Sequence, residues 1–104
     1  MAVALPYAFG SFSFDNELWI HNGDLLDNPQ FVEMEMVSAG PFRLEVYDAA
    51  NGLVRSYPRP NPHGGWHTFS FANEAPVPAG DHELKLVNDA SGTATGKSGR
   101  VETR

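Results

Sequence analysis

Two stretches decide the fold class of this chain: Trp66-His67-Thr68-Phe69-Ser70-Phe71 and Gly80-Asp81-His82-Glu83-Leu84-Lys85-Leu86-Val87. In each stretch apolar residues alternate with polar ones. A period of two places the apolar side chains on one face of a strand, and that face must be buried. Residues 76–80, between the two stretches, contain two prolines and cannot join a central ladder, because proline has no N–H to donate. The pattern predicts two antiparallel strands of a sheet-on-sheet core, joined around a corner.

Working outward, the same alternation recurs in several segments separated by Gly, Pro, Asn and Asp. They lie near residues 10–14, 18–21, 31–37, 42–46 and 53–57, and the small, polar tail adds at most a weak edge strand around 100–102. No segment has a helical period. The chain is therefore expected to be all-β, a small antiparallel β-sandwich of Ig-like or jelly-roll type with seven or eight strands. Its predicted core comprises Val32, Met34, Phe42, Leu44, Val46, Phe69, Phe71, Leu84 and Leu86.

Length and composition limit the class of protein. The 104 residues correspond to one domain and contain no Cys, which excludes a disulfide framework, a thiolate metal site and a Cys nucleophile. No basic segment followed by an apolar run comes after Met1, so we expect no cleaved secretory signal. No apolar stretch approaches the roughly 20 residues that cross a membrane, so no membrane association is expected.

The negative charge is concentrated in the first part of the sequence. Residues 1–42 hold six acids and no Lys or Arg, whereas residues 43–104 hold seven acids and seven bases, which gives the net charge of −6. This charge would repel a phosphate backbone, so nucleic-acid binding is disfavoured. A basic protein surface or a cation would be attracted. Alternatively, the acids only keep an aromatic-rich segment soluble.

The N-terminal segment is unusually apolar for a chain end. Leu5, Tyr7 and Phe9 precede the first predicted strand. We predict an arm at residues 1–9 and a sandwich at 10–104, with the alternative that the arm folds back on its own sandwich. In the arm interpretation, removal of residues 1–9 leaves stability almost unchanged and abolishes assembly. The predicted assembly interface comprises Leu5, Pro6, Tyr7, Phe9, Glu33 and Glu35.

No catalytic set, cofactor motif or metal site is predicted. Gly96-Lys97-Ser98 fails as a phosphate loop because position 91 is Ser where the motif needs Gly, and because too few residues follow for a helix. His63 and His67 are four residues apart, but the glycines between them forbid a helix, and zinc would need a third ligand. Calcium between loops at Asp24, Asp27 and Asn28 stays open, although the spacing matches no known loop pattern.

One cluster of aromatic and basic residues provides an alternative function. Its members are Tyr47, Tyr57, Arg59, His63 and Trp66. Tyr and Trp with Arg are typical of interfaces, and flat aromatic rings also stack on the faces of sugars. A carbohydrate-binding site is therefore predicted here as the alternative, unless Trp66 belongs to the core, as one large aromatic often does in a sandwich.

Two short resemblances bear on fold and function. Val77-Pro78-Ala79-Gly80-Asp81-His82-Glu83-Leu84-Lys85-Leu86 resembles the turn-and-strand of many Ig-like and jelly-roll accessory modules, which implies the fold. Leu5-Pro6-Tyr7-Ala8-Phe9-Gly10 looks like the N-terminal phrase of some tailed-phage virion proteins, which implies a structural part of a virus particle. The expected function is a non-enzymatic assembly module that docks on a larger particle, such as a virion decoration or tail protein, with a protein partner or as a homo-oligomer. The alternative is a carbohydrate-binding module.

Overall fold

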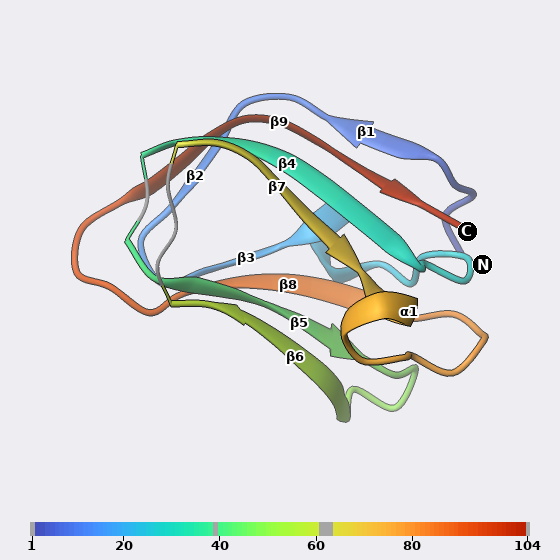
Figure 1. Ribbon diagram of the computed structural model, residues 1–104. Helices are drawn as coiled ribbons and strands as arrows, with labels where there is room; N and C mark the ends of the chain where they lie inside the picture. Colours follow the sequence, from blue (N-terminus) through green and yellow to red (C-terminus); the bar gives the residue numbers. More distant parts are fainter. Residues whose placement is uncertain (1, 39, 61–63, 104) are drawn as a thin grey trace.

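The computed structural model describes residues 2–38, 40–60 and 64–103, which form a sandwich of two antiparallel sheets (Figure 1). The predicted all-β sandwich is confirmed. These residues contain nine strands, one or two more than predicted, and two single-turn helical segments, η1 (Ile20–Gly23) and α1 (Phe71–Glu74). None of the described helices is long or apolar enough to span a membrane.

The strands divide five to four between the sheets. The first sheet has the order β1-β9-β4-β7, with β2 also paired to β9; its strands are β1 (Tyr7–Phe9), β2 (Phe12–Phe14), β4 (Phe31–Ser38), β7 (Gly65–Ser70) and β9 (Ala94–Glu102). The second sheet has the order β3-β8-β5-β6; its strands are β3 (Glu17–Trp19), β5 (Phe42–Tyr47), β6 (Leu53–Arg59) and β8 (Glu83–Asn88).

The core lies between the sheets and follows the predicted alternation. All nine predicted core residues are buried, namely Val32, Met34, Phe42, Leu44, Val46, Phe69, Phe71, Leu84 and Leu86. Their polar neighbours on the same strands point to the outer faces. The two stretches that predicted the fold are β7 and β8, and they lie in opposite sheets, as the predicted corner requires.

The corner itself contains a helical turn that the pattern did not predict. The strand predicted through Phe71 ends at Ser70, and the chain turns through α1, where the amide of Ala75 donates to the carbonyl of Phe71. The Phe71 side chain nevertheless stays buried. Beyond the corner, Leu26 and His82 exchange two backbone hydrogen bonds of 2.8 and 3.1 Å and tie the returning chain to the body.

The sequence predicted at most a weak edge strand in the C-terminal tail. The structure instead contains an interior strand there. β9 runs over nine residues and pairs with β1 and β2 on one side and with β4 on the other. Its small residues are needed there, because a Cβ at Gly96 would lie 2.0 Å from Cζ of Phe12, and a Cβ at Gly99 would lie 2.2 Å from Cζ of Phe9. Aromatic rings packed on strand glycines replace the side chains that the tail lacks.

The N-terminal segment belongs to the sandwich and is not a free arm over its described length. β1 pairs with β9 in the register Tyr7 to Val101 and Phe9 to Gly99, and Figure 1 shows the two strands side by side. The amide of Val3 donates to the carbonyl of Leu25 at 2.8 Å. The alternative in which the segment folds back on its own sandwich therefore describes the structure.

Candidate functional site

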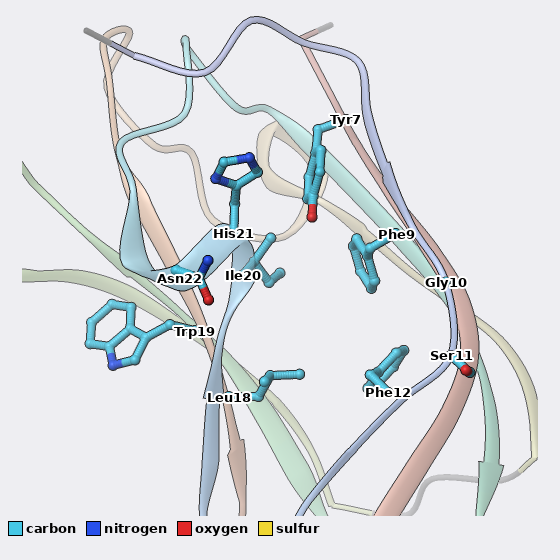
Figure 2. A pocket seen from close by; sticks show the side chains of 10 residues that line it. All are labelled: Tyr7, Phe9, Gly10, Ser11, Phe12, Leu18, Trp19, Ile20, His21 and Asn22. Atoms are coloured by element: carbon cyan, nitrogen blue, oxygen red, sulfur yellow. The ribbon is translucent and has the colours of Figure 1, made fainter.

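A cleft opens at one lateral edge of the sandwich, where β1 and β2 of the first sheet face β3 and η1 of the second. It encloses about 290 Å³. Figure 2 shows the side chains that line it; they are Tyr7, Phe9, Ser11, Phe12, Leu18, Trp19, Ile20, His21 and Asn22, together with Gly10. The lining contains no Asp, Glu, Lys or Arg.

Three aromatic rings form one wall of the cleft. The ring centroids of Tyr7 and Phe9 are 5.9 Å apart, and those of Phe9 and Phe12 are 5.5 Å apart in an edge-on arrangement. Phe9 and Phe12 occupy these places because they pack on the bare backbone of Gly99 and Gly96. Strand pairing thus positions the wall, and all three rings remain partly exposed.

The opposite wall is aliphatic, and Figure 2 shows Leu18 and Phe12 facing one another across the cleft. Above it the chain leaves β3 and turns through η1 with two residues in the left-handed region, His21 at φ 52° and Asn22 at φ 58°. Such angles are uncommon outside glycine and cluster at functional sites. The His21 ring and the Asn22 side-chain amide thus lie at the mouth of the cleft.

His21 is fixed by two contacts. Its Nδ1 donates to the carboxylate of Asp24 at 2.8 Å, and its ring meets the ring of Tyr7 edge-on, with centroids 4.8 Å apart. Because Nδ1 carries the hydrogen in this arrangement, Nε2 of the neutral ring is a hydrogen-bond acceptor. Among the described residues, nothing forms a hydrogen bond with Nε2.

Trp19 lies on the other side of β3 and points away from Phe9 and Phe12 (Figure 2). Its ring centroid is 5.2 Å from that of Tyr47, and the Nζ atom of Lys85 lies 4.9 Å from each of the two ring centroids. Next to Trp19 lies a second, shallow hollow of about 230 Å³, lined by Trp19, Asn22, Gly23, Asn51 and Glu83.

Glu45 anchors the polar residues beneath Trp19. It accepts hydrogen bonds from the Tyr47 hydroxyl at 2.6 Å and from Nε of Arg43 at 2.9 Å, and Nζ of Lys85 lies 3.5 Å away. Burial raises the pKa of Glu45, but these hydrogen bonds and the positive charges of Arg43 and Lys85 outweigh it, so that the net pKa lies below its ordinary value. The carboxylate therefore stays ionised and holds Lys85 beside the indole.

The six residues of the predicted assembly interface do not form one surface. Leu5, Tyr7 and Phe9 pack against the core, whereas Pro6 is exposed. Glu33 and Glu35 lie on the outer face of the first sheet, where Glu33 accepts from Arg100 at 2.6 Å. Packing of the apolar set against its own sandwich reduces the free apolar surface on which the arm interpretation depended.

The predicted sugar site is likewise dispersed. Tyr57 is 1% exposed, stacks on Phe71 at 4.8 Å and donates to the carbonyl of Ala75, and burial raises its pKa to about 12. It is therefore a core residue and not a surface residue as predicted. Tyr47 lies on the outer face of the second sheet, and Trp66, 53% exposed, lies on that of the first.

Arg59 is engaged in closing the edge between β6 and β7. It forms an ion pair with Glu74 at 2.5 Å and donates to the carbonyl of Thr68 at 2.8 Å, with its guanidinium 4.0 Å from the centroid of the Phe69 ring. His63, the fifth member of the predicted site, lies outside the described residues. The structure thus does not bring the predicted sugar-site residues together.

No metal centre is apparent within residues 2–38, 40–60 and 64–103, which contain no group of three or more His, Asp or Glu side chains able to hold an ion. His67 is buried, with its ring edge-on to Phe42 at 5.5 Å. The carboxylate of Asp24 is bound to His21. Gly96-Lys97-Ser98 lies within β9 and forms no loop.

Sequence reasoning missed most of the cleft, including Phe12, Leu18, Trp19, His21 and Asn22. One signal was available, because Phe9 and Phe12 are three residues apart, as are Gly96 and Gly99, which is the spacing that antiparallel ring-on-glycine pairs require. Comparison with known proteins adds no further guide: no family model, curated protein or solved structure matches this chain.

Proposed function

We propose that this protein is a non-enzymatic carbohydrate-binding module whose site is the aromatic cleft between β1, β2 and β3. The observation that carries the proposal is the combination of three aromatic rings on one wall with neutral hydrogen-bonding groups at the mouth. The site thus differs from the one that the sequence predicted around Trp66.

Sugars match this chemistry on two counts. A pyranose ring has apolar C–H faces that pack on aromatic rings and hydroxyl groups around its edge that need donors and acceptors. The Tyr7 hydroxyl, the Asn22 amide and Nε2 of His21 supply such groups. The lining contains no Asp, Glu, Lys or Arg, which favours a neutral ligand over a phosphate, a carboxylate or an amine.

The size and rigidity of the cleft support the same class of ligand. Its volume of about 290 Å³ is near the lower limit of ligand pockets, which span roughly 300–1,000 Å³, so it suits one small ring and not a large cofactor. His21 is held by Asp24 and Tyr7, and Phe9 is held on Gly99. A preformed site avoids the entropy cost of ordering its side chains on binding.

A glycan array followed by titration calorimetry tests the proposal. The array identifies a neutral saccharide, and Asn22→Gly then removes one amide while retaining a residue that adopts the left-handed backbone without strain. We expect affinity to fall about tenfold or more, as the loss of roughly 1.4 kcal/mol would produce. Tyr7→Phe removes the hydroxyl group and should also weaken binding.

Trp66→Ala is the matched control, because it removes the exposed tryptophan of the sheet face away from the cleft. Binding should be unaffected by this change. Failure of every saccharide on the array to bind would overturn the proposal, as would loss of binding in Trp66→Ala with no loss in Asn22→Gly.

A second candidate function, docking on a larger particle such as a virion, is favoured by one observation. Val37 and Trp66 are 61% and 53% exposed on the neighbouring strands β4 and β7 of the first sheet. Glu35 is the cross-strand partner of Trp66, and no ion pair with Glu35 is found among the described residues. A basic protein surface with an apolar projection would complement this face.

Affinity capture from the native source with the wild-type chain and with Trp66→Ser and Glu35→Lys variants tests this candidate. Each variant should lose a partner that the wild-type chain retains, and that partner should be basic and released by salt. Retention of the same partner by both variants would exclude this face as the docking surface.

A further inference from the structure

We propose that the binding site continues across η1 into the second hollow, so that the module takes an oligosaccharide of at least two sugar units. This inference rests on the proposed function and extends it from one sugar ring to a chain. The two hollows, of about 290 and 230 Å³, share Trp19 and Asn22 in their linings. They therefore lie on either side of one short stretch of chain.

A second observation, the positions of residues with left-handed backbone, also connects the two hollows. Among the described residues, four non-glycine residues have positive φ, namely His21, Asn22, Asn28 and Asn51. His21 and Asn22 line the first hollow, and Asn22 and Asn51 line the second, so only Asn28 lies in neither. Both hollows are thus lined by residues whose backbone conformation is uncommon outside glycine.

The chemistry of the second hollow differs from that of the first in a way that suits the hydroxyl-rich edge of a sugar. Its lining combines the amides of Asn22 and Asn51 with the carboxylate of Glu83. Amides donate and accept, and a carboxylate accepts two hydrogen bonds from neighbouring hydroxyls. Asn51 is positioned by the β5–β6 turn, where its backbone N–H donates to the carbonyl of Asp48 at 2.9 Å.

Trp19 provides the apolar part of the second hollow, and its surroundings hold it in place. Backbone of Gly23 lies against the ring, since a Cβ there would be 3.6 Å from it. Lys85 and Tyr47 flank the ring on the outer face of the sheet. Asn22 lines both hollows and so lies between the two proposed sugar positions.

A chain-length series tests the inference. Calorimetry would use glucose, galactose and N-acetylglucosamine and their homo-oligomers of two to four units, together with any saccharide selected by the array. We expect affinity to rise about tenfold or more from one unit to two, equivalent to roughly 1.4 kcal/mol, and to change little beyond three.

Variants of the second hollow make the assignment specific. Asn51→Gly and Glu83→Gln should reduce the affinity for the two-unit sugar to that for the single unit while leaving single-unit binding unchanged. Asn28→Gly is the matched control, because it makes the same change at a left-handed residue outside both hollows. It should leave both affinities unchanged.

The outcomes separate this inference from the proposed function. Equal affinities for one and two units, or no effect of Asn51→Gly and Glu83→Gln on two-unit binding, would overturn the two-hollow site and leave the single-ring site in place. No binding of any saccharide would overturn the proposed function and this inference with it.

Discussion

The two lateral edges of the sandwich are built differently. At the edge formed by β6 and β7, side chains and the chain after α1 bridge the sheets: Arg59 reaches from β6 to Glu74 and Thr68, and the hydroxyl of Tyr57 donates to the carbonyl of Ala75. At the edge formed by β1, β2 and β3, the His21 ring of η1 meets only that of Tyr7 among the described rings, and the cleft opens between Phe9, Phe12 and Leu18.

This difference separates aromatic residues that stabilise the fold from aromatic residues that remain accessible to a ligand. The closed edge buries Phe69 and Phe71 completely beneath Arg59 and Tyr57. The open edge leaves Phe9 and Phe12 only partly buried, packed on glycines of β9. Aromatic surface that remains accessible in a preformed cleft contributes less to stability and is free to contribute to binding.

Truncation of one phenylalanine at each edge gives the largest expected contrast. Phe69→Ala at the closed edge should cost about 3–5 kcal/mol of the free energy of unfolding, through lost burial and a cavity. Phe12→Ala at the open edge should cost roughly 1–3 kcal/mol, because part of the ring already faces solvent. Urea denaturation of both variants measures the difference, and an equal or reversed ranking would show that the edges are packed alike.

Removal of residues 1–9 tests whether the N-terminal segment is structural. The deletion removes β1 and the packing of Val3, Leu5, Tyr7 and Phe9 on the core. We expect a loss of about 2–5 kcal/mol from these partly buried side chains, and a fall in Tm of roughly 10 °C or more. A Tm within a few degrees of that of the full chain would instead restore the free arm that the sequence predicted.

Gly99→Ala probes the placement of the aromatic wall. Its Cβ would lie 2.2 Å from Cζ of Phe9, so that the ring or the strand must move, at a cost of about 1–3 kcal/mol. Gly10→Ala is the control, since nothing lies within 4 Å of its Cβ position. In the Phe9→Ala background the effect of Gly99→Ala should shrink, and full additivity in the double-mutant cycle would disprove the contact.

A pH dependence is also expected at the closed edge. Burial raises the pKa of Tyr57 to about 12, above its unfolded value, so that the fold favours the neutral phenol. This contribution to stability is fully present below the unfolded pKa of roughly 10 and is lost as the pH rises towards the folded value. Denaturation midpoints should fall as the pH rises between these two values, and Tyr57→Phe should weaken this pH dependence. The same pH dependence in the variant would show that another group causes it.

The core was predictable from the sequence because it depends on local alternation. Phe69, Leu84 and the other predicted core residues are buried, since a period of two fixes which face of a strand is apolar. The tail was mispredicted because Gly96 and Gly99 contribute no side chains of their own. Only the pairing of β9 with β1 and β2, distant in sequence, reveals that rings from the other end of the chain cover them.

The cleft was less predictable for the same reason. Asn-Gly pairs are typical of turns, and Asn22-Gly23 lies in η1. The left-handed backbone at His21 and the opposition of Leu18 and Phe12 across two sheets depend on tertiary packing, which local patterns do not encode. The predicted sugar residues were grouped by proximity in sequence, whereas Tyr47, Tyr57 and Trp66 point to different faces of the fold.

Chemical-shift mapping by ¹H–¹⁵N NMR tests most directly whether the open edge binds ligands and the closed edge does not. A saccharide selected by the array would be titrated into the full chain. Shift changes are expected at residues 7–12 and 18–23, with Asn51 and Glu83 added for a two-unit sugar, and none at Arg59 or Trp66. Changes centred on Arg59 or Trp66, or spread evenly over both edges, would contradict the assignment of function to the open edge.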